Sequence, residues 1–179
     1  MPNIIAAEGK SPSMVSHSDF YLKLGDIKGE SLDDKHKGEM ELLSFSFGVA
    51  QPGGAASVGT GSGVGKAQFH EFEFTKLVDA ASAKLMLACA SGQHFPEVTL
   101  TCRRAGGTQA EYMKIKMEQV LVSGYTIGPG DSNLNDRLPV DTVRINYSKI
   151  GFNYKAQNAD GSEGANTMTG WDLNKNVKI

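Results

Sequence analysis

The chain has 179 residues, of which 40% are hydrophobic and 21% are charged, and its formal net charge is −2 at pH 7. This length suits one domain, and the apolar share is enough for a packed core, which excludes disorder of the whole chain. No run of lysine or arginine offers the basic surface of a nucleic-acid-binding protein.

The N-terminal residues lack the basic start and the sustained apolar stretch of a secretory signal peptide, and no apolar run approaches the roughly 20 residues of a membrane helix. We therefore expect the protein to be made and folded in the cytosol. That compartment disfavours a disulfide between Cys89 and Cys102, so both are interpreted as buried, inert thiols.

Short segments of alternating polarity predict a mainly β protein. In residues 19–24, Phe20, Leu22 and Leu24 share one face of a strand. Residues 25–39 are polar and predict a loop. In residues 43–47, the odd positions are apolar and face a core, whereas Ser44 and Ser46 face water or a cavity.

Residues 52–65 are rich in glycine and serine and predict a long flexible loop. A further strand is expected over residues 68–75. Residues 82–92 break the alternation with a run of helix formers, which Asp79 or Ser82 can cap and Gly92 can end. This predicted helix is apolar almost all round, so more than one surface should cover it.

Strand signals resume after the helix, and Gly106-Gly107 indicates a hairpin turn. Between residues 112 and 122 the apolar positions change phase, which predicts a β-bulge near Glu118 or Gln119. A similar change follows Tyr147. Two bulged long strands favour a strongly curved sheet or a barrel. The tail, residues 157–179, is polar, and the lone Trp171 lies near its end.

A search for chemical motifs finds no site. Gly65-Lys66 is preceded five positions earlier by Thr60 and followed by Ala67, which departs from the phosphate-binding loop. The four histidines lack zinc-ligand spacing. A nucleophile formed by Cys89 and His94 is disfavoured because an apolar helix suppresses ionisation of the thiol. We therefore predict no enzyme activity, no catalytic residue, no metal and no cofactor.

The ordered motifs resemble those of the Hcp (haemolysin-coregulated protein) family, the tube protein of type VI secretion systems. The resemblance covers the chain from about Asp19 to near the C-terminus. It is carried by the segments DFYLKLGDIKGES (19–31), KHK (35–37), LSFSFG (43–48), FTKLVD (74–79), LACASG (87–92), LTCRRAGG (100–107) with Glu111-Tyr112, VLVS (120–123) and NADGS (158–162). The sequence departs from the family at Ala83 and Ala156, where proline is usual, and in loop 128–138.

The resemblance implies a single compact β-barrel of two curved antiparallel sheets, with one short α-helix on its side and long loops. Residues 1–18 are then an N-terminal extension and residues 19–179 the barrel domain. It further implies hexameric rings that stack into a tube, are exported by the type VI route without a cleavable signal, and carry small effectors in the lumen. The expected partners are other copies of the chain, the spike protein, the contractile sheath and small effectors, with neither nucleic acid nor membrane insertion.

Within that framework, Ser44 and Ser46 are predicted to face the lumen and contact effectors. The predicted subunit or ring–ring contacts are Leu85 and Met86 of the helix, Lys28, Glu30 and Ser31 of loop 25–39, and Val58 of the glycine-rich loop. Two alternatives remain open, namely a subunit similar to a phage tail tube and a monomeric β-barrel binding module.

Overall fold

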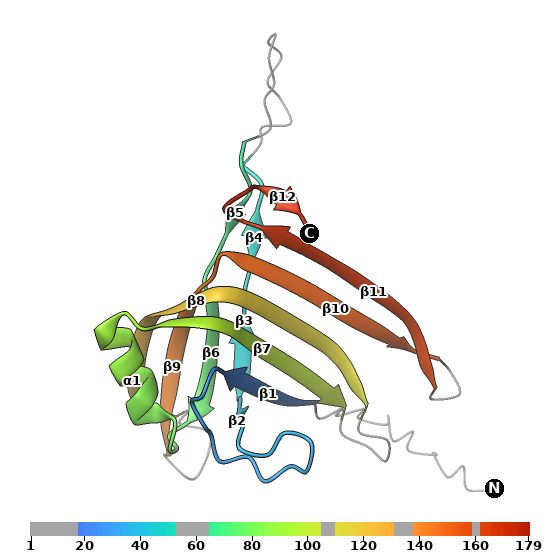
Figure 1. Cartoon of the computed structure of the whole chain (residues 1–179). Helices are drawn as coiled ribbons and strands as arrows, with labels where there is room; N and C mark the ends of the chain where they lie inside the picture. Colours follow the sequence, from blue (N-terminus) through green and yellow to red (C-terminus); the bar gives the residue numbers. More distant parts are fainter. Residues whose placement is uncertain (1–17, 53–64, 105–109, 131–137, 159–161) are drawn as a thin grey trace, which may run out of the picture.

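The computed structural model describes residues 18–52, 65–104, 110–130, 138–158 and 162–179. Twelve strands and one helix form within them (Figure 1). The strands are β1 (Ser18–Leu24), β2 (Met40–Glu41), β3 (Ser44–Ser46), β4 (Val49–Ala50), β5 (Gln68–Phe69), β6 (Phe72–Leu77), β7 (His94–Arg104), β8 (Glu111–Pro129), β9 (Pro139–Asn146), β10 (Lys149–Gln157), β11 (Glu163–Asp172) and β12 (Val177–Lys178); the helix α1 is Ser82–Ser91.

The long strand β8 connects two curved antiparallel sheets. Its first half pairs with β7 on one side and β10 on the other, and its second half pairs with β9. One sheet continues from β7 to β1 and β2, and the other continues from β9 to β6 and β3. Figure 1 shows the resulting layers, with β7, β8 and β10 crossing in front of the steeper β3, β6 and β9.

The covalent chain completes the barrel between β2 and β3. The N–H of Leu42 donates to the carbonyl of Phe20 in β1 at 2.9 Å, and the next N–H, from Leu43, donates to the carbonyl of Thr75 in β6 at 2.8 Å. The chain thus leaves one sheet and joins the other within two residues. The predicted mainly β barrel with one helix is confirmed, while β10, β11 and β12 extend one sheet beyond it.

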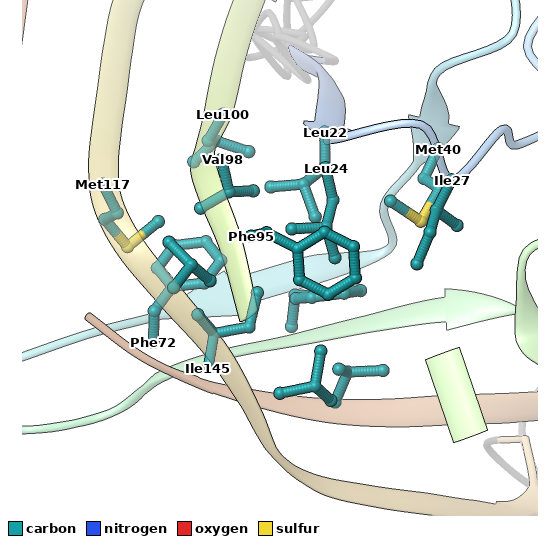
Figure 2. Close-up of a cluster of buried hydrophobic side chains, with 14 of the residues drawn as sticks. Leu22, Leu24, Ile27, Met40, Phe72, Phe95, Val98, Leu100, Met117 and Ile145 are labelled. Carbon is teal, nitrogen blue, oxygen red and sulfur yellow. The ribbon is translucent and has the colours of Figure 1, made fainter. Parts of the chain in front are cut away.

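Apolar and polar residues alternate along the strands, and the apolar side chains form the core between the two sheets. Leu22 and Leu24 of β1 and Phe72 and Phe74 of β6 are completely buried. Figure 2 shows Leu22, Leu24, Val98, Leu100, Met117 and Ile145 converging from different strands. Ser44 and Ser46 of β3 and Glu73 and Thr75 of β6 point the other way, and they form part of the site described below.

The predicted irregularity of β8 lies at Gln119, which has a positive φ of 53°. There the apolar phase changes from Ile115 and Met117 to Val120 and Val122. The ladder with β9 shifts register slightly later, between Val122 and Gly124. The phase change after Tyr147 is different, because it separates two strands, β9 and β10. The predicted second bulged strand is therefore wrong.

Helix α1 ends as predicted at Gly92, whose φ of 64° places it in the left-handed region. The Oδ1 of Asp79 accepts the N–H of Ala81 at 2.8 Å and so fixes the turn that precedes the helix. Ser82, Leu85 and Ala88 are buried against the barrel. By contrast, Met86 and Leu87 are 54% and 62% exposed. One side of the helix is thus covered within the chain, and an apolar side remains open.

Two other segments differ from their sequence-based expectations. The predicted strand 68–75 is two strands, β5 and β6, interrupted at His70 and Glu71. The polar tail contains a full strand, β11, which pairs with β10 over nearly its whole length. Alternation did not reveal β11 because its residues are mostly exposed on both faces.

Candidate functional site

A polar face covers the outer side of the sheet formed by β3, β6, β9 and the second half of β8. Strand register arranges its side chains in two rows across the four strands. The first row is Ser44, Thr75, Thr142 and Thr126, and the second is Ser46, Glu73, Arg144 and Gly124. The first row therefore presents only hydroxyl groups, and the second contains one acid and one base.

Two pairs of side chains on this face form hydrogen bonds with each other. The hydroxyl groups of Ser44 and Thr75 lie 2.6 Å apart. The Nε of Arg144 donates to Oε2 of Glu73 at 2.7 Å, and this hydrogen bond raises the pKa of Arg144. A Cβ added at Gly124 would lie 3.4 Å from Cβ of Arg144, which is an ordinary van der Waals contact. The face is wettable and carries paired charges.

The alternation of buried and exposed side chains predicted for residues 43–47 is found at Ser44, Phe45 and Ser46. Ser44 and Ser46 are exposed on the polar face. Phe45, between them, points to the core, where its ring lies 5.2 Å from Phe20 and 6.0 Å from Phe72. Leu43 departs from the pattern and is half-exposed, because it lies where the chain crosses between the sheets.

A hollow of about 370 Å³ continues the polar face toward β5. It is lined by Ser46, His70, Glu71 and Arg144 among others. The sequence search did not single out His70 or Glu71 as site residues, because the interruption between β5 and β6 that positions them was not predicted.

The predicted contact residues occupy different environments. Leu85 is completely buried in its own barrel, whereas the adjacent Met86 projects from it. Lys28 and Glu30 are exposed, but Ser31 is buried and its hydroxyl donates to Oε1 of Glu41 at 2.7 Å. Val58 lies outside the described residues. Met86, Lys28 and Glu30 are therefore the members of this set that present side chains at the surface.

Loop 25–39 is held to the barrel by a buried arginine. The Nη1 of Arg103 donates to Oδ1 of Asp33 at 2.9 Å and its Nη2 donates to Tyr21, while the guanidinium lies 5.1 Å from the centre of the Tyr21 ring. His36 stacks on that ring at 4.3 Å. The loop was predicted from its polar sequence, but the burial of His36, which is 5% exposed, was not.

Comparison with known proteins identifies the family. Residues 21–154 match the family model described as "Type VI secretion system effector, Hcp". The chain belongs to the Hcp family. It is 40% identical to protein Hcp1 of Pseudomonas aeruginosa over 162 residues, which is 89% of this chain and 98% of that protein.

Solved structures agree with this assignment. A structure described as a type six secretion system protein superposes with a TM-score of 0.84 at 32% identity, covering 91% of this chain and 100% of the other. Hcp1 from Salmonella typhimurium superposes with a TM-score of 0.70 at 30% identity, covering 90% of this chain and 99% of that chain.

The described residues contain no group of three or more His, Cys, Asp or Glu side chains arranged to hold a metal ion. Burial raises the pKa of the Cys102 thiol to about 12, so it stays protonated at physiological pH. Among the same residues, no helix has the length and hydropathy needed to cross a membrane.

Proposed function

We propose that six copies of this chain form a ring, that rings stack into the tube of a type VI secretion system, and that the polar face lines the lumen. The observation that carries the proposal is the pair of cross-strand rows in which hydroxyl groups and one ion pair cover a sheet whose other side is core. The chain acts by assembly and not by catalysis.

The polar face has the surface chemistry that a lumen requires. Cargo must enter and leave, so the wall must be wet and must not offer large apolar side chains that adsorb protein. Ser44 and Ser46 supply small hydroxyl groups, and the charge of Arg144 is neutralised by Glu73. Small effectors then contact Ser44 and Ser46 through hydrogen bonds that are individually weak.

The open side of α1 supplies a subunit contact. Met86 and Leu87 are adjacent, apolar and more than half exposed, and burial of such side chains drives protein association. In a closed ring each copy uses two different surfaces, so this helix meets a surface other than itself on the neighbouring copy. Lys28 and Glu30, which are exposed on loop 25–39, belong to the contacts between subunits or between rings, whereas Ser31 is buried and does not. The same role is proposed for Val58, which lies outside the described residues.

Export follows the type VI route, in which the tube is driven outward with its spike by the contractile sheath. Spike, sheath and small effectors are accordingly the partners of this chain besides its own copies.

The native mass of purified protein tests the ring. A six-subunit species in native mass spectrometry, with a central hole in electron micrographs, is expected. A protein that stays monomeric at every concentration measured would contradict the proposal and would favour a monomeric β-barrel binding module. A stable ring with a different number of subunits would contradict the hexamer.

A further inference from the structure

The two ends of the barrel differ in charge. In Figure 1, β4, β5 and β12 lie at one end of the molecule, and β2, loop 25–39 and the C-terminal end of β6 lie at the other. The first end, here called the lysine end, carries Lys66, Lys175 and Lys178, beside β5 and in or before β12. From Val49 to Gly65 the sequence contains no charged residue.

The lysine end also exposes apolar side chains. Val49 of β4 and Val177 of β12 are 56% and 45% exposed. Within the described parts of the chain, none of the three ammonium groups has an ion-pair partner. Other lysines of the sheet are different, since Lys114 pairs with Glu111 and Lys155 pairs with Glu163.

The opposite end carries an apolar groove with an acidic rim, here called the acidic groove. Its volume is about 300 Å³, and its apolar lining includes Leu43, Leu77 and Val78, each between 39% and 49% exposed. Glu30, Glu41 and Asp79 form the rim. One oxygen of Glu30 accepts the N–H of Ala80 at 3.1 Å, which holds this carboxylate beside the groove.

We infer that the lysine end of one copy docks on the acidic groove of a second copy in the next ring. The two surfaces carry opposite charges, both expose apolar side chains, and they lie at opposite ends of the barrel. An interface between two different surfaces that does not close on itself produces an open, polar stack. Exposed Val49 and Val177 then meet Leu43, Leu77 and Val78, while lysines meet the glutamates of the rim. This inference rests on the proposed function, because it assumes that the copies form rings. It goes further by naming the two surfaces that are in contact between consecutive rings.

Charge pairs at the edge of an interface steer and select partners, and salt screens them. Stacking of wild-type rings should therefore weaken roughly tenfold between about 50 mM and about 500 mM salt, as the screening length shortens. A stack held only by apolar contacts would not weaken in this way.

Charge reversal tests the docking in the full chain. Rings of the K175E/K178E variant and rings of the E30K/E41K variant should each fail to stack, because like charges then face each other. An equal mixture of the two kinds of ring should stack again, since every junction in an alternating stack restores opposite charges. Sedimentation velocity and electron microscopy at low salt measure the stacks, and native mass spectrometry checks that each variant still forms rings.

The K84E/K116E variant is the matched control, because it makes the same change of net charge as K175E/K178E on helix α1 and in strand β8, and it should stack like the wild type. A carbodiimide, which joins carboxylates directly to ammonium groups, should also couple Lys175 or Lys178 to Glu30 or Glu41 between ¹⁴N- and ¹⁵N-labelled copies. Intact rings that give neither this coupling nor rescue in the mixture would overturn the inference. Absence of rings would instead contradict the proposed function.

Discussion

At the residue scale, the least expected feature is a lysine buried completely inside the barrel. The ammonium of Lys76 lies 3.0 Å from Oδ2 of Asp141 and 2.7 Å from Oδ1 of Asp79. It also donates to the carbonyl of Leu77 and to the hydroxyl of Ser82, and Tyr125 donates to the other oxygen of Asp141 at 2.7 Å. This network ties the start of α1 to β6, β8 and β9, so its role is structural.

Removal of the Lys76 charge should strongly destabilise the fold. The K76M variant leaves Asp141 buried without its cation, which costs about 3–5 kcal/mol of unfolding free energy. The K76M/D141N double variant should recover part of this loss, because no charge remains buried. Denaturant unfolding at one fixed protein concentration measures both. The exposed control K84M should change stability by less than about 0.5 kcal/mol, and an equal effect of K76M and K84M would contradict the network's role.

At the scale of elements, loop 25–39 behaves as part of the barrel because side chains from three segments fasten it. The hydrogen bond from Arg103 lowers the pKa of Asp33 to about 2, from the ordinary 3.8, and two backbone N–H groups of the loop also donate to this carboxylate. His36 extends the attachment, since its Nε2 lies 3.4 Å from Oε1 of Glu111 in β8. Lys28 and Glu30 are therefore presented from a fixed loop.

A pH dependence follows from the lowered pKa of Asp33. Its contribution to stability is complete above its ordinary pKa and is lost as pH falls through the folded value, that is between about 4 and about 2. The D33N variant should lack this part of the acid transition, and its loop amides should exchange hydrogen faster at neutral pH. Hydrogen-exchange mass spectrometry measures the loop.

The neighbouring D34N variant is the control, because Asp34 is exposed and has no side-chain partner in the described part of the chain. Equal loop protection in D33N and wild type would show that Arg103 does not fasten the loop.

At the scale of the whole molecule, one sheet faces outward with a polar face and the helix leaves an apolar side open. A S46Q variant should keep the ring but change the amount of small effector that remains bound, because a longer amide side chain then projects from the polar face. Co-purification of rings with the effectors of their own secretion system measures retention. The T167Q variant changes an exposed hydroxyl on β11 and should retain cargo normally. Dissociation of S46Q into single subunits would contradict a lumen position for Ser46.

The sequence by itself was enough to locate the strands that have one apolar and one polar face, because one face of each such strand lies in the core. Residues 19–24, the serines flanking Phe45, the helix with its Gly92 exit and the irregularity at Gln119 were all predictable in this way. The ordered motifs also carried the family resemblance, which the comparisons confirm. Strand β11 was missed because neither of its faces is apolar enough to show a period.

Only the tertiary structure decided which polar residues are buried and which surfaces lie together. Lys76, Arg103 and His36 have the sequence character of surface residues, yet each is buried. Lys76 and Arg103 pair with carboxylates distant in sequence, and His36 stacks on the ring of Tyr21. Likewise, the two rows of the polar face depend on the register of four strands, and the lysine end and acidic groove depend on how the chain closes the barrel. The alternation of apolar residues shows which side of a strand or helix faces the core. The pairing of distant strands determines which side chains lie next to one another.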